Sequence, residues 1–209
     1  MSFLLRSFEP SGATELQGGT TFLRAPQLAD HAEWAQLRGE SRDFLEPWEP
    51  SWSADTLSRA AFRRRLRRYA RDTRDDHGIA FLVFRKDDST LVGGITLSNI
   101  RRGVTQSCSV GYWIGERFAR EGYMGDALKT ITHFVFDGLR LHRLEAACVP
   151  SNTASQSLLL KCGFVEEGSA RKYLCINGNW RDHTLFAILG SDPRPGEKTA
   201  PEVMLARSA

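Results

Sequence analysis

The sequence predicts a mixed α/β fold in a single domain. Apolar residues alternate in some stretches and recur at helical spacing in others, so strands and helices follow one another along the chain. With 209 residues, 41% of them hydrophobic and 25% charged, the chain can bury a sizeable core and is not disordered. No apolar run reaches the roughly 20 residues that span a bilayer, so we expect a cytoplasmic protein with no membrane partner.

The first half of the chain predicts a strand, two helices and a hairpin. The elements in order are a strand at 20–24, a helix capped by Asp30 and ending near Arg38, a Pro/Trp-rich loop at 44–52, a helix capped by Ser53 and ending near Arg71, and strands at 79–85 and 91–99. Leu57, Phe62 and Leu66 keep a helical spacing, so we expect them on the buried face of the second helix.

The second half alternates strands with helices and ends in a hairpin. Its elements are a strand at 106–114, a helix at about 122–136, a strand at 144–149, a helix at 153–161 that Gly163 stops, and strands at 164–176 and 180–189 around Asn177-Gly178-Asn179. A strand, a helix and another strand in succession predict a parallel strand pair. We expect the domain to span 20–190, between a loose lead-in at 1–19 and a flexible tail at 191–209.

The passage from the strand 110–114 into the helix near Gly122 has the chemistry of a phosphate site. The first N–H groups of a helix have no intrahelical partner, and together with the helix dipole they suit a pyrophosphate. Gly122 lets a ligand approach the backbone, and Arg120 adds positive charge nearby. The P-loop and dinucleotide-binding patterns are both missing, so this turn alone is explained equally well by a strand–helix turn with incidental glycines.

A second strand-to-helix turn, Val149-Pro150-Ser151-Asn152-Thr153-Ala154-Ser155, favours a coenzyme site. Together the two turns resemble the coenzyme A half of the GNAT acetyltransferase fold. The loop 44–50, the triplet Leu141-His142-Arg143 and the segment 173–183 recur in the order typical of the RimJ-type branch, the ribosomal-protein-alanine N-acetyltransferases. The resemblance covers 20–189. It implies a central mixed, mostly antiparallel sheet, with a splayed parallel strand pair whose exposed edge takes the pantetheine chain, and helices on both faces.

The resemblance further implies acetyl-CoA as co-substrate and no metal. The coenzyme-binding residues that it implies are Trp113, Ile114, Arg120, Glu121, Gly122, Tyr123, Met124, Gly125, Asn152, Ser155 and Lys161. The phosphate loop departs from the family's usual Gln/Arg-x-x-Gly-x-Gly/Ala, because Ala119 and Met124 stand at its two ends. Leu159 stands where the family often has the tyrosine that protonates the thiolate, so Ser155 is the remaining hydroxyl for that proton.

The implied reaction is a direct attack of an amine on the thioester, without an acyl-enzyme. A backbone N–H near Ile114 would hold the donor carbonyl, and Ser155 would donate to the departing thiolate. Glu49 and Glu145 are the candidates for the base that takes the ammonium proton, and each is equally consistent with a surface carboxylate.

The acceptor that the resemblance implies is the N-terminal α-amino group of a ribosomal protein, with Trp48, Tyr173 and Trp180 as candidates to line its site. The alternatives are an acetyltransferase for a small molecule (a polyamine, an antibiotic or an amino acid) and a nucleic-acid-binding module. The helix around Arg59–Arg74 carries eight arginines. They form either a solvated helix face or a weak contact with RNA beside the ribosomal protein.

Overall fold

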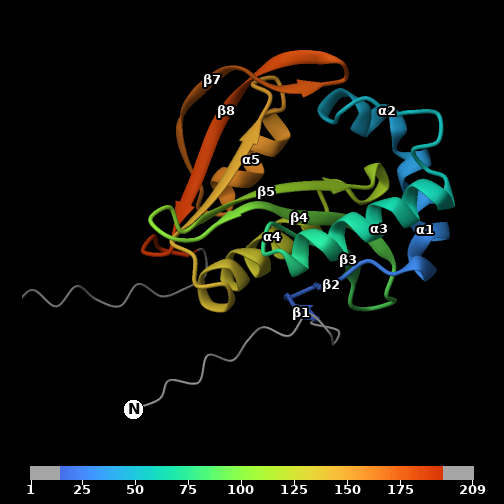
Figure 1. Cartoon of the computed structure of the whole chain (residues 1–209), viewed down its shortest axis with the longest axis horizontal. Coiled ribbons are helices and arrows are strands. Elements are labelled where there is room, and N and C mark those ends of the chain that lie inside the picture. Colours follow the sequence, from blue (N-terminus) through green and yellow to red (C-terminus); the bar gives the residue numbers. More distant parts are fainter. Residues whose placement is uncertain (1–14, 195–209) are drawn as a thin grey trace, which may run out of the picture.

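The computed structural model describes residues 15–194 and consists of one eight-stranded sheet with helices on both faces (Figure 1). The strand order is β1-β2-β3-β4-β5-β6-β8-β7, and every neighbouring pair is antiparallel except β5–β6. The predicted mixed sheet with one parallel pair is therefore confirmed. The strands are β1 (Leu16–Gln17), β2 (Thr21–Arg24), β3 (Ile79–Arg85), β4 (Leu91–Arg101), β5 (Ser107–Ile114), β6 (Arg143–Cys148), β7 (Val165–Ile176) and β8 (Asn179–Leu189).

The helices divide between the two faces of the sheet. They are η1 (Leu28–Asp30), α1 (His31–Glu40), α2 (Arg42–Leu45), η2 (Glu46–Trp48), α3 (Arg59–Arg74), η3 (Glu116–Phe118), α4 (Tyr123–His133), the π-helical turn η4 (Phe134–Gly138) and α5 (Thr153–Lys161). Side chains of α1 and α3 pack on one face, and those of α4 and α5 pack on the other. Within residues 15–194 no helix is long and apolar enough to cross a membrane.

The core has two parts because successive residues of a strand point to opposite faces. In β3, Phe81 and Val83 belong to the cluster under α4 and α5, whereas Leu82 and Phe84 belong to the cluster under α1 and α3. Each such side chain contributes about 1.5–3 kcal/mol when it is fully buried. The sheet is consequently fixed on both faces, and this rigid platform carries the site.

Two predicted helix caps were wrong. Ser53 does not cap α3: the helix begins later, where Ser58 lies in an extended conformation and its Oγ accepts the N–H of Ala61 at 3.1 Å. Asp30 stands at the N-cap position of α1, but its side chain makes no capping bond to that helix, because its carboxylate binds the guanidinium of Arg24 and, in the capping box of η1, the N–H of Gln27. A charged partner binds a carboxylate more strongly than a helix N–H group does, so the ion pair prevails.

The lead-in is shorter than we predicted, since Leu16–Gln17 already pairs with β2. The carboxylate of Asp126 in α4 accepts the N–H groups of Gly19, Thr20 and Thr21, at 2.8 to 2.9 Å, and the Thr21 hydroxyl at 2.7 Å. These bonds tie the start of the sheet to the first turn of α4. The rest of the predicted lead-in, and the predicted tail beyond residue 194, lie outside the described residues.

Candidate active site

The only parallel strand pair of the sheet opens into a splay. β5 and β6 pair at three positions, Ser107 with Arg143, Cys108 with Leu144 and Ser109 with Glu145. Beyond Ser109 the two strands part, so the segment 110–114 keeps its ladder with β4 and, among the described residues 15–194, has no strand paired to its other edge. Unpaired strand edges bind extended chains. The splay therefore offers a backbone edge to a linear, amide-containing ligand.

The start of α4 forms an open anion cradle at one end of this edge. Gly122 has φ 89°, a left-handed conformation that favours glycine, and a Cβ placed there would meet no atom within 4 Å. The first intrahelical bond runs from the Asp126 N–H to the Gly122 carbonyl at 3.0 Å, which leaves the N–H groups of Tyr123, Met124 and Gly125 free for a ligand. Because the Met124 side chain is buried in the core, its backbone is what faces the cradle.

Charged residues flank the cradle on the surface. Arg120 and Glu121 are both exposed and immediately precede Gly122. Lys161, by contrast, is exposed at the far end of α5, roughly 12 Å along the helix axis from Thr153. The structure thus brings Arg120 and Glu121 to the anion cradle and places Lys161 away from the first turn of α5.

The first turn of α5 presents a hydroxyl pair to the splay. The Asn152 side chain caps the helix by accepting the N–H of Ser155 at 3.0 Å, which fixes this serine. The Ser155 Oγ lies 2.8 Å from the Oη of Tyr112, a residue of the unpaired segment of β5. Burial raises the pKa of Tyr112, partly offset by the Ser155 bond, so the phenol stays protonated and can donate to Ser155. Leu159 is buried in the core and supplies no proton.

Tyr112 was not predicted as a site residue, although the sequence pattern around it could have indicated its role. In the strand 106–114 Cys108, Val110 and Tyr112 alternate onto one face, and Tyr112 is the phenol on that face at the level where the strands part. Cys148 adjoins the same hydroxyl pair from β6. Burial raises the pKa of the Cys148 thiol, and a hydrogen bond with Ser155 offsets part of that rise. Both partners of the Ser155 hydroxyl, Tyr112 and Cys148, are therefore kept in their neutral forms.

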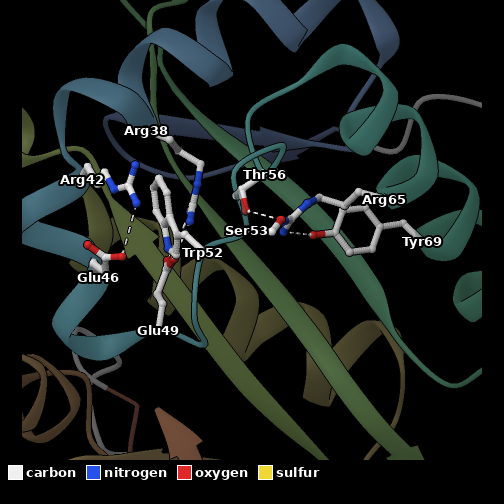
Figure 2. A network of polar contacts seen from close by, with 9 residues as sticks. All are labelled: Arg38, Arg42, Glu46, Glu49, Trp52, Ser53, Thr56, Arg65 and Tyr69. Atoms are coloured by element: carbon white, nitrogen blue, oxygen red, sulfur yellow. Dashed lines mark hydrogen bonds and ion pairs between the residues drawn. The ribbon is translucent and has the colours of Figure 1, made fainter. Parts of the chain in front are cut away.

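The opposite face carries a buried arginine, Arg38, in contact with aromatic rings, of which Trp52 is drawn in Figure 2. The guanidinium of Arg38 in α1 lies 4.6 Å from the ring centroid of Trp52 and 4.8 Å from that of Trp113 in β5. Only 4% of Arg38 is exposed, and its Nε has no hydrogen-bond partner. Its other nitrogens bind the carboxylate of Glu49, at 3.2 Å for one pair of atoms. A buried arginine of this kind requires its carboxylate.

Glu49 joins three parts of the molecule. Its carboxylate accepts hydrogen bonds from Arg38 and from the indole N–H of Trp52, at 3.0 Å, and its backbone carbonyl accepts the N–H of Asn177 at 2.8 Å. Asn177 lies at the tip of the β7–β8 hairpin, which extends from the sheet toward α2 (Figure 1). The carboxylate predicted as a base is thus engaged by two donors that hold the Trp-rich loop in place.

Glu145 lies at the position where the splay opens. It pairs with Ser109 on β5, so its side chain shares a face with Ser109 and, two residues further, with Gly111. A Cβ on Gly111 would meet no atom within 4 Å, which leaves room above the strand for an amine. Glu145 accepts the Nε of Arg143 at 2.8 Å and remains 33% exposed. It is the more accessible of the two predicted carboxylates.

The predicted acceptor aromatics all lie on the surface. The exposed fractions are 36% for Trp48 in η2, 48% for Tyr173 in β7 and 65% for Trp180 in β8. Trp180 pairs with Cys175 beside the hairpin tip, and a Cβ on Gly178 would lie 3.5 Å from the Ser51 hydroxyl. The loop that holds Trp48 and the hairpin that holds Trp180 therefore adjoin one another.

Comparison with known proteins agrees with this geometry. Residues 21–165 match the family model described as "Acetyltransferase (GNAT) domain". A Bacillus subtilis protein named "Probable N-acetyltransferase YjcK" is 34% identical, covering 85% of this chain and 98% of that protein. The Escherichia coli "[Ribosomal protein uS5]-alanine N-acetyltransferase" is 33% identical over 80% of this chain and 87% of its own length. The structure of Mycobacterium smegmatis RimJ with a CoA-disulfide superposes with a TM-score of 0.78, at 31% identity, covering 85% of this chain and 86% of that one.

Proposed function

This chain belongs to the GNAT acetyltransferase family and is an N-acetyltransferase, and we propose that it transfers the acetyl group of acetyl-CoA to the N-terminal α-amino group of a ribosomal protein. The acceptor follows from the relatives, since the E. coli protein that is 33% identical is named for alanine N-acetylation of ribosomal protein uS5. The observation that supports acetyl-CoA as the acetyl donor is the splay between β5 and β6, with an anion cradle at its end.

The donor site fits acetyl-CoA group by group. The free N–H groups at the start of α4 suit the pyrophosphate, and the unpaired edge at 110–114 suits the two amides of the pantetheine arm. Bound acetyl-CoA supplies an activated thioester. A backbone N–H of β5 near Ile114 would stabilise the carbonyl oxygen as it gains charge. Trp113 and Ile114 lie on opposite faces of the same edge and flank the thioester.

Ser155 is the group that would donate a hydrogen bond to the departing thiolate, which then takes up its proton from solvent. Asn152 holds its backbone, and a hydrogen bond from the Tyr112 phenol to its Oγ would direct the serine O–H proton away from the tyrosine. No proton has to pass from the phenol, because the serine keeps its own proton, and the raised pKa of Tyr112 keeps the phenol protonated as a hydrogen-bond donor. Tyr112 is thus a positioning residue that acts through Ser155.

Glu145 is our choice for the group that takes the ammonium proton, directly or through water. It faces the open space above Gly111, and its partners Arg143 and Arg101, the latter at 4.0 Å, leave its side chain 33% exposed. Glu49 is less exposed and is engaged by Arg38 and Trp52. An α-amino group has a pKa of roughly 7.7–8.0, so a modest base suffices. Glu145→Gln should lower kcat/KM about 100-fold below pH 7 and less at pH 9. An unchanged profile would exclude Glu145 from this role.

The test of the acceptor uses purified protein, acetyl-CoA and a set of matched amines. A peptide that begins with alanine should be acetylated at its α-amino group. The same peptide with a blocked N-terminus and a free lysine, and free spermidine, are the controls. Mass spectrometry of ribosomal proteins from cells with and without the protein then identifies the substrate. Exclusive acetylation of spermidine would overturn the protein acceptor and favour a small-molecule enzyme.

A further inference from the structure

Helix α3 carries a row of arginines that the reaction does not use. Arg59, Arg63, Arg67 and Arg71 follow one another at intervals of four residues, and all four are exposed. The row spans roughly 18 Å along the helix axis. None of the four guanidinium groups forms a hydrogen bond or an ion pair with another residue of the described segment 15–194. Four guanidiniums are therefore available on one surface.

Three other arginines of α3 differ from this row, because their side chains have partners within the protein. Arg64 pairs with Asp55, Arg74 pairs with Asp75, and Arg65 donates to the Tyr69 hydroxyl at 3.4 Å (Figure 2). Arg65 also lies over Trp34, 5.4 Å from the ring centroid, so its role is to cover the core. The helix is anchored by Phe62, which is 1% exposed. The row of four arginines on the outer side of the helix therefore does not hold the helix in place.

The chemistry of this outer side favours a phosphate backbone over a protein. Its exposed residues are arginines and the two alanines Ala60 and Ala70. Protein interfaces depend on buried aromatic and aliphatic anchors, and this face has none. Arginine binds phosphate oxygens with two parallel N–H groups and requires no apolar contact. Binding to nucleic acid through its backbone is driven by charge alone.

We propose that the α3 row docks the protein on the phosphate backbone of RNA. The choice of RNA over DNA rests on the proposed function, because a ribosomal acceptor is assembled on RNA. α3 packs on the same sheet face as Trp113, the face on which we place the acceptor. RNA held by the row would therefore lie on the acceptor side of the molecule.

The experiment measures binding of the full-length protein to a fluorescent 20-base-pair RNA duplex between 50 and 200 mM NaCl. Four phosphate contacts predict a loss of about 100-fold in affinity over this range. The triple variant R63E/R67E/R71E should lose binding at 50 mM. The control K129E/R140E/R171E changes the same net charge at exposed positions elsewhere and should keep most of it.

Several outcomes would overturn the proposal. An equal loss of RNA affinity in both triple variants would show that binding depends on net charge and not on the α3 row. An affinity that does not change with salt would exclude phosphate contacts. Tighter binding of the matching DNA duplex would overturn the choice of RNA. Effective competition by polyglutamate would indicate an acidic protein instead. Acetylation of the alanine peptide by R63E/R67E/R71E should be unchanged, so failure of the proposed function and failure of RNA docking are distinguishable.

Discussion

The two sides of the splay are built in different ways. The coenzyme side consists of two local turns, each made within about ten consecutive residues, at Gly122 and at Asn152. The acceptor side brings together α1, the loop 46–52, β5 and the tip of the β7–β8 hairpin, which are far apart in the sequence. Local turns depend on backbone conformation, whereas the acceptor side depends on long-range packing around Arg38. The donor side is thus set by local geometry, and the acceptor side by tertiary contacts.

The largest effect should come from the coenzyme side, through Gly122→Val. A β-branched residue is strained at φ 89°, and its side chain would fill the cradle, so affinity for acetyl-CoA should fall on the order of 100-fold. Isothermal calorimetry measures this directly. Gly103→Val is the matched control, since Gly103 also has a positive φ (67°) and open space around its Cβ. Equal losses in both variants would show that strain alone accounts for the effect.

Ser155→Ala should lower kcat about 30-fold, corresponding to about 2 kcal/mol for a lost hydrogen bond to a developing charge. Tyr112→Phe should lower it about 5-fold, because the serine loses its orientation. In the double variant Tyr112→Phe should add no further loss, since its effect passes through Ser155. KM for acetyl-CoA should change little. Ser157→Ala, at an exposed position of α5, serves as the control.

Additive losses in that cycle would contradict the positioning role and give Tyr112 an independent contact with the donor. A change in KM without a change in kcat would place both residues in coenzyme binding alone.

On the acceptor side, Glu49→Gln should raise KM for the acceptor peptide about 10-fold and leave affinity for acetyl-CoA unchanged. The variant loses the ion pair with Arg38, so the Trp-rich loop loosens while the cradle at α4 is intact. Glu46→Gln removes a carboxylate of the same loop that pairs with the exposed Arg42, and it is the control. If Glu49→Gln instead flattens the pH dependence of kcat/KM, the base lies at Glu49 and not at Glu145.

The smallest effect concerns the link between α4 and the start of the sheet. Burial alone would raise the pKa of Asp126, but hydrogen bonds from Thr21 and from the N–H groups of residues 19–21 outweigh it and lower the pKa. A lowered folded-state pKa adds stability above the usual aspartate pKa of roughly 3.9, and this stability disappears as the pH falls through the folded value. Asp126→Asn should therefore cost about 2 kcal/mol at pH 7 and progressively less below pH 4.

Urea unfolding at pH 7 and pH 3 measures this difference, with the exposed Asp43→Asn as the control. A cost that stays constant with pH would show that the ionised carboxylate is not what holds the N-terminal turn.

The sequence predicted the two strand-to-helix turns well, because turn and cap residues act locally. Gly122, Asn152 and Gly163 lie at the helix boundaries where their chemistry placed them. Ser53 and Asp30 were wrong as caps, because Ser58 and the ion pair with Arg24 compete for the same roles. The surroundings of Arg38 could not be predicted, since Trp52 and Trp113 come from two distant segments and converge on α1. Tyr112 needed the spatial proximity of two elements that are 43 residues apart.

The three β5–β6 pairs have a mechanical consequence. Within residues 15–194 they are the only ladder between the β1–β5 and β6–β8 halves of the sheet, so this junction should open more readily than the longer ladders on either side of it, β4–β5 and β6–β8. A bound pantetheine arm would bridge the opening and slow amide hydrogen exchange along 110–114. The hairpin tip at Asn177 belongs to the second half, and its bond to Glu49 closes the opposite end of the same opening. Binding of acetyl-CoA should therefore reduce the motion of the segments that form the acceptor site. We predict an ordered kinetic mechanism in which acetyl-CoA binds before the amine.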